Sequence, residues 1–122
     1  MDVNGLFRTV SAVLQLGNIT YHDLDHAAVL RNDECQYACN LLGVKQDDLA
    51  QVLTIRSYSA NHEDYKVPLT VPSAVTARDA LAKTVYAGTF DYLVKQLNAT
   101  TTASIAPRTI GLLDIFGFES LA

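Results

Sequence analysis

The sequence predicts a mixed α/β fold in which helices dominate, and three patterns carry that prediction. Apolar residues recur at intervals of three and four over 3–16 and 72–98, as in helices that bury one face. Apolar and polar residues alternate over 54–70, as in a β-hairpin. A short apolar run rich in Ile and Leu, residues 108–115, is typical of a buried core strand.

The first half of the chain is predicted to hold three helices joined by polar connections. The helix over 3–16 is expected to stop at Gly17-Asn18, because glycine commonly follows the last turn of a helix. Residues 20–32 are mostly polar and predict a loop with a short extended piece. Two shorter helices, 34–42 and 46–53, are expected next, and both begin with acids that suit the helix dipole.

The second half is predicted to contain a hairpin and the longest helix. The hairpin over 54–70 is expected to have a long, polar and acidic tip at residues 60–64. The helix over 72–98 would be roughly 40 Å long at 1.5 Å per residue. Its apolar residues cover much of its surface, so we expect it to be largely buried, with an ion pair between Asp79 and Lys83. Residues 99–107 are predicted to form a flexible connector.

Composition limits the classes of protein that the chain can be. Its 122 residues are enough for one small domain, and 49% hydrophobic with 18% charged residues indicates a globular protein. A net charge of −4 predicts no general attraction for nucleic acid or an anionic membrane. The sequence has no bilayer-length apolar run and no secretory signal profile at its start, so the default expectation is a cytosolic protein without a membrane span.

Four metal-capable side chains lie close together in the sequence and leave an alternative open. His22, His26, Cys35 and Cys39 could supply a zinc site with two histidines and two cysteines. However, the cysteine pair of such sites is usually two residues apart on a turn, whereas this pair is four apart in a predicted helix. Buried, reduced thiols and solvated histidines are therefore the favoured interpretation, and a small zinc module is the alternative.

The end of the chain places two acids around a glycine. Asp114 stands where the predicted core strand ends, and Gly117 and Glu119 follow it. In nucleotide-binding α/β proteins an acid at a strand end can lie near a magnesium ion, and a glycine beside it lets backbone approach a phosphate. The alternative is a core strand that turns at Gly117 and leaves its acids on the surface.

The literal string of residues 114–119, Asp-Ile-Phe-Gly-Phe-Glu, resembles the switch II motif of the myosin motor domain. Kinesins have a different string at this place. Three further segments are similar to myosin sequences: Leu-Gln-Leu-Gly-Asn-Ile at 14–19, Ala-Arg-Asp-Ala-Leu-Ala-Lys at 77–83 and Phe-Asp-Tyr-Leu-Val at 90–94. The aromatic Phe116 looks more like the unconventional myosins than the muscle type. The resemblance implies an α/β fragment of a P-loop NTPase motor, a class that myosins and kinesins share.

The resemblance also implies a division of the chain and a set of roles. Residues 1–107 would be part of the upper, actin-side lobe, and residues 108–122 would be the core strand and switch II loop of a single incomplete domain. Asp114 would lie near the Mg²⁺ of bound ATP, through water. The amide of Gly117 would donate to the γ-phosphate. Glu119 would pair with an arginine of the first switch and help to position the attacking water.

The hairpin tip corresponds to an actin-contacting loop in the resemblance. Many myosins require an acid, or a phosphorylatable Ser or Thr, at a fixed distance before the Ala-Arg-Asp-Ala-Leu-Ala-Lys helix. Glu63 occupies that place, with His62 and Asp64 beside it. The implied partners are an actin filament and the remainder of the motor domain, and the implied location is the cytoplasm, on the cytoskeleton.

Two other myosin elements have no counterpart in the sequence. A myosin ATPase needs a Gly-rich loop that ends in Gly-Lys-Ser or Gly-Lys-Thr, and no Gly-Lys pair occurs here. The first switch, with its serine and arginine, is also missing. We therefore expect the 122-residue chain alone to hydrolyse no ATP, and turnover by the purified chain would contradict this. The alternative interpretation is a non-catalytic remnant that acts at most as a binding module.

Overall fold

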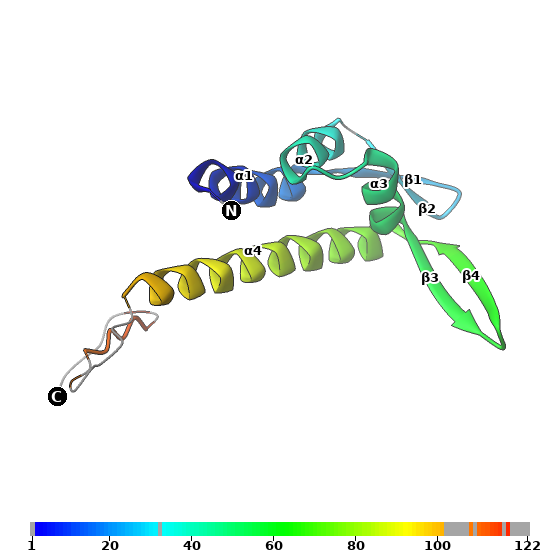
Figure 1. The fold of residues 1–122 in the computed structure, drawn as a ribbon. Coiled ribbons are helices and arrows are strands. Elements are labelled where there is room, and N and C mark those ends of the chain that lie inside the picture. The colour runs from blue at the N-terminus through cyan, green and yellow to red at the C-terminus, as the bar shows by residue number, and fades with distance from the viewer. Residues whose placement is uncertain (1, 32, 102–107, 109, 116, 118–122) are drawn as a thin grey trace.

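The computed structural model describes residues 2–31, 33–101, 108, 110–115 and 117 (Figure 1). The elements in chain order are α1 (Val3–Asn18), β1 (Tyr21–Leu24), β2 (Ala27–Leu30), α2 (Glu34–Leu42), α3 (Gln46–Thr54), β3 (Ile55–Ala60), β4 (Glu63–Pro68) and α4 (Val71–Thr101). Helix α4 forms a long rod, α1 lies along it, α2 packs on α1, and the β3–β4 hairpin projects from the N-terminal end of α4 (Figure 1).

Helix α1 begins at a side-chain cap and ends where its sequence predicts. The Asp2 carboxylate accepts a hydrogen bond from the Gly5 amide at 2.7 Å, which satisfies one of the first-turn donors. The helix ends at Asn18, so the stop predicted at Gly17-Asn18 is confirmed. The end of the helix brings Leu16 and the capping residue Ile19 fully into the core.

A second hairpin occupies the region that was predicted to be mostly loop. Strands β1 and β2 pair antiparallel, with Leu24 opposite Ala27. Asp25 and His26 form the turn with φ of 50° and 66°, and the His26 amide donates to the Asp23 carboxylate at 3.0 Å. The sequence signal was weak because Asp and His, not glycine, adopt the left-handed backbone here.

Helices α2 and α3 confirm the two short helices predicted from the sequence. Helix α2 has the predicted bounds, and Gly43 follows it with φ of 71° and an amide that donates to the Cys39 carbonyl at 2.8 Å. This left-handed residue needs glycine, because a Cβ would be strained there. Helix α3 begins at Gln46 as predicted and ends at Thr54, one residue later than predicted.

Helix α4 is longer and more exposed than its sequence predicts. It includes residues 99–101, which were predicted to belong to a connector, while 102–107 lie outside the described residues. Tyr86, Phe90 and Leu97 are each 55% exposed, so the expectation of a largely buried helix is wrong for this chain. The reason is that the core cluster contacts only the N-terminal part of α4, whereas Tyr86 and Phe90 lie further along the helix, beside an open pocket between α4 and α1.

The core lies where the end of α1, the β1–β2 hairpin, α2, α3 and the start of α4 meet. Its buried residues are Leu16, Ile19, Tyr21, Ala28, Cys35, Ala38, Cys39, Leu49, Leu53 and Ala74. Each of these elements buries one of its sides in this cluster, which explains why their apolar residues recur with helical or strand periodicity.

The two cysteines are free, buried thiols within this core, as predicted. Burial raises the pKa of Cys35 to about 11 and also raises the pKa of Cys39, so both stay protonated at neutral pH. His22 and His26 are exposed on the β1–β2 hairpin. Within the described ranges no three His, Cys, Asp or Glu side chains gather as metal ligands would.

Arg78 joins α4 to the end of α1. Its guanidinium donates to the carbonyl of Ile19 at 2.7 Å and to the carboxylate of Asp79 at 2.8 Å, and its side chain is 16% exposed. The sequence predicted an ion pair of Asp79 with Lys83, but Asp79 pairs with Arg78 instead. The Arg78 guanidinium is held beside Asp79 because it also binds the end of α1, where it satisfies a helix-end carbonyl.

The predicted core strand at 108–115 is wrong for the described residues. Residues 110–115 have no strand or helix, and Leu112 is 99% exposed. A buried parallel strand needs neighbouring strands and cover on both faces. The two sheets of the described chain, β1–β2 and β3–β4, are separate antiparallel pairs and neither includes this segment. The division of the chain at residue 107 stays a prediction.

Candidate functional site

The β3–β4 hairpin projects away from the N-terminal end of α4 (Figure 1). Its strands pair antiparallel from Ile55 opposite Pro68 to Ala60 opposite Glu63. Asn61 and His62 form a two-residue turn with φ of 53° and 64°. Two successive positive φ values are what a type I′ turn requires, and this turn suits the twist of paired strands. The alternating pattern in the sequence therefore predicted the hairpin correctly, but the long tip expected over 60–64 is wrong, because Ala60, Glu63 and Asp64 belong to the paired strands.

The tip brings together the three residues predicted to contact a partner. His62, Glu63 and Asp64 are all exposed there. The Tyr65 hydroxyl donates to Glu63 Oε2 at 2.8 Å, and the Ser59 hydroxyl donates to Asp64 Oδ1. Each carboxylate of the tip is therefore held by a hydroxyl group of the same hairpin.

The two carboxylates lie on opposite faces of the hairpin. Successive strand residues point to opposite faces, so Glu63 shares a face with Tyr65, and Asp64 takes the other face. Tyr65 is directly opposite Tyr58, and their rings stack with centroids 5.4 Å apart and an interplanar angle of 20°. One face of the hairpin thus carries a tyrosine pair that leads to the Glu63 carboxylate.

The sequence did not single out this tyrosine pair. The available signal was its position, because Tyr58 and Tyr65 are equally distant from the Asn61-His62 turn. A two-residue turn fixes the register, and that register places these two rings opposite each other. Choosing the turn residues correctly would have predicted the stack.

The base of the hairpin is tied to the core through its backbone. The amide of Leu69 donates to the Thr54 carbonyl at 2.8 Å, and the Ala28 amide donates to the Leu69 carbonyl at 2.7 Å. These bonds connect the end of β4 to α3 and to β2. The hairpin direction is therefore set by the core, although its strands are exposed.

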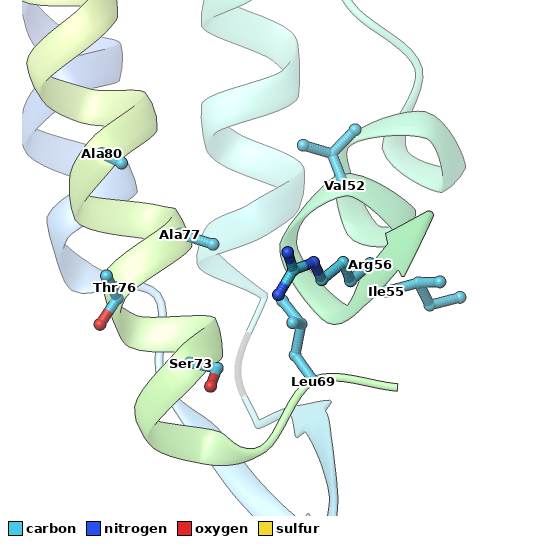
Figure 2. A pocket seen from close by; sticks show the side chains of 8 residues that line it. All are labelled: Val52, Ile55, Arg56, Leu69, Ser73, Thr76, Ala77 and Ala80. Atoms are coloured by element: carbon cyan, nitrogen blue, oxygen red, sulfur yellow. The ribbon is translucent and has the colours of Figure 1, made fainter. Parts of the chain in front are cut away.

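A pocket of about 420 Å³ lies beside this base, between α3 and the first turns of α4 (Figure 2). Figure 2 shows side chains from α3, from the start of β3 and from α4 around it. Its lining residues are Val52, Ile55, Arg56, Leu69, Ser73, Thr76, Ala77 and Ala80. None of them was predicted as a site residue, and most present apolar atoms to the pocket.

The terminal segment holds the other predicted site residues. Asp114 is exposed and belongs to no regular element. Gly117 has φ of +95°, a backbone conformation that glycine adopts readily and other residues rarely do. Glu119 lies outside the described residues. The structure therefore describes the acid and the glycine of the predicted phosphate-sensing turn, but not its second acid.

The two candidate regions lie at opposite ends of α4 (Figure 1). The hairpin joins the N-terminal end of this helix, and residues 110–115 follow beyond its C-terminal end. A helix of 31 residues is about 46 Å long at 1.5 Å per residue. The structure does not bring His62, Glu63 and Asp64 near Asp114 or Gly117, so these groups cannot form one site.

Comparison with known proteins identifies the class. A family model described as myosin head (motor domain) matches residues 1–122. The chain therefore belongs to the myosin motor-domain family. It is 39% identical over 117 residues to Myosin-K heavy chain of Dictyostelium discoideum, a match that covers 93% of this chain and 14% of that protein.

Two unconventional myosins give similar matches. The chain is 37% identical to human Unconventional myosin-Ih, over 97% of this chain and 13% of that protein. It is 38% identical to rat Unconventional myosin-Ic, over 97% of this chain and 12% of that protein. The chain thus spans about one eighth of the length of these relatives, and its similarity to the unconventional type agrees with the sequence-based expectation. None of the helices in the described part of the chain combines the length and hydrophobicity needed to cross a bilayer.

Proposed function

We propose that this chain works as part of an actin-activated myosin motor ATPase, with the actin filament and the remainder of the motor domain as its partners. Its proposed place is the cytoskeleton. Two regions take part: the β3–β4 hairpin, which contacts actin, and the segment from Asp114 to Glu119, which acts as the switch II sensor of the γ-phosphate. The family match over residues 1–122 supports this proposal.

The single observation that carries the actin-contact role is the projecting hairpin with an exposed carboxylate at its tip. Glu63 lies where the type I′ turn returns into β4, beyond the packed core. The chain has a net charge of −4, so it gains nothing from bulk attraction to an acidic filament. The Glu63 carboxylate must therefore act locally, on a particular basic group of the partner.

Replacing Glu63 with glutamine in the intact motor tests this role. We expect the affinity for actin to fall about three- to tenfold, because one charge-assisted contact is lost while the side chain keeps its shape. The measurement is actin co-sedimentation at several salt concentrations, and the loss should shrink as salt rises.

Asp48→Asn is the matched control for this experiment. It removes the same charge from an exposed position on α3, outside the hairpin tip. We expect the control to bind actin as the wild type does. Equal affinities for wild type and Glu63→Gln at low salt would contradict the contact role.

For the nucleotide, we propose that Asp114 and Gly117 face the phosphates of ATP and its Mg²⁺. The described residues fit this role. A carboxylate is an oxygen donor of the kind that Mg²⁺ prefers, through water or directly. Apart from the chain neighbours of Gly117, the described residues place no heavy atom within 4 Å of the position that a Cβ on it would take, which leaves room for a phosphate at its backbone. Bound Mg²⁺ would neutralise charge that develops on the transferred phosphate.

The catalytic role proposed for Glu119 depends on a partner from elsewhere in the motor. Its carboxylate would pair with the arginine of the first switch and help to position the attacking water. The sequence holds no Gly-Lys-Ser/Thr phosphate loop, so we propose that ATP binding needs the remainder of the motor domain. The chain alone is accordingly expected to be inactive.

A further inference from the structure

We propose that Tyr65 is a positioning residue, which holds the Glu63 carboxylate in the orientation that contacts actin. This inference rests on the proposed function of the hairpin tip. Tyr65 is not itself proposed to contact actin. The inference follows from one hydrogen bond and one ring stack on the hairpin face that carries Glu63.

The hydrogen bond joins two neighbours on the same face of β4. The Tyr65 hydroxyl donates to Glu63 Oε2 at 2.8 Å, and the residues are two apart along the strand. A carboxylate has two oxygens and several acceptor positions. Oε1 and the remaining lone pairs of Oε2 therefore stay available to a partner while the Tyr65 bond fixes the side chain.

The Tyr65 ring is itself held in place, so its hydroxyl is a fixed point. The ring stacks on Tyr58 of the facing strand, with centroids 5.4 Å apart. The strand pairing and the Asn61-His62 turn fix the register that brings these rings together. A tyrosine ring is also placed by only two side-chain torsions. The stacked Tyr58 and Tyr65 rings are therefore a rigid support for the hydroxyl that binds Glu63.

Fixing Glu63 before binding reduces what binding must order. A free glutamate on an exposed strand samples many rotamers, and immobilising such a side chain at an interface lowers affinity by about two- to tenfold. The hydrogen bond from Tyr65 already orders the Glu63 side chain in the unbound motor. Asp64 has a comparable bond from Ser59, but on the other face of the hairpin.

Tyr65→Phe in the intact motor tests the inference, since it keeps the ring stack and removes only the hydroxyl. We expect the affinity for actin to fall about two- to tenfold. The matched control is Tyr58→Phe, which removes a hydroxyl from the other ring of the same stack, and it should bind as the wild type does.

A double variant separates positioning from a general effect on the hairpin. In a Glu63→Ala background the tyrosine has no side-chain oxygen to orient, so adding Tyr65→Phe should cause no further loss. Equal losses from Tyr65→Phe in both backgrounds would show that Tyr65 acts through the hairpin fold or by its own contact, and would overturn the inference. Wild-type affinity for Tyr65→Phe would overturn it too.

The same set of variants distinguishes this inference from the proposed function. If Glu63→Gln weakens binding and Tyr65→Phe does not, the positioning role fails and the contact role survives. If Glu63→Gln binds as the wild type does, the contact role of Glu63 fails, and the positioning role fails with it whatever Tyr65→Phe does.

Discussion

Gly117→Ala is expected to lower the actin-activated ATPase rate of the intact motor about 10²- to 10³-fold. The φ of +95° at Gly117 is strained for any residue with a Cβ, at a cost of about 1–3 kcal/mol. Relaxing that strain would move the backbone amide that we propose to donate to the γ-phosphate. Removing one preorganised donor of this kind commonly costs 10²- to 10³-fold in kcat. Steady-state phosphate release with saturating actin measures the effect.

Gly88→Ala provides a matched control for this substitution. Gly88 lies within α4 and has open space where a Cβ would stand. Alanine there should leave the ATPase rate unchanged and stabilise the helix by up to about 1 kcal/mol. An ATPase rate within twofold of wild type for Gly117→Ala would contradict the sensor role of this residue.

Leu53→Ala is expected to destabilise the actin-side part of the motor by about 2–5 kcal/mol. Leu53 is 0% exposed and lies in the core with Leu16 and Ile19, so its loss leaves a cavity among residues from several elements. The midpoint of thermal unfolding of the intact motor, monitored by loss of actin binding, should fall clearly.

The neighbouring residue Val52 supplies the control for this prediction. It lies on the same helix but is 60% exposed, so Val52→Ala removes little buried surface. Alanine also has the higher helix propensity, so the midpoint should stay the same or rise slightly. Equal decreases for the two variants would contradict the assignment of Leu53 to the core.

The sequence predicted best those elements whose pattern is local. The helices α2 and α3 and the β3–β4 hairpin follow from periodicity and from acids or glycine at their ends. The β1–β2 hairpin was missed because its turn uses Asp25 and His26 with left-handed backbones instead of glycine. The strand expected at 108–115 depends on neighbours that no local pattern supplies.

The candidate site shows the same division between local and distant information. Glu63 was proposed from the resemblance to myosins, many of which need an acid at a fixed distance before the following helix, and that distance can be counted along the sequence. The Tyr65 bond to Glu63 required the strand register and the rotamer of an exposed side chain. The contact of Arg78 with the Ile19 carbonyl joins residues 59 positions apart, so it could only be seen in the folded chain.

The exposed segment from Ile110 to Ile115 has a practical consequence for work on the isolated chain. It is rich in Ile and Leu, carries one acid and no base, and its backbone is paired in neither of the two described sheets. Such a stretch is a template on which a second molecule can add as a strand. Light scattering across a dilution series is therefore the first quality check for any preparation of these 122 residues, before binding constants are interpreted.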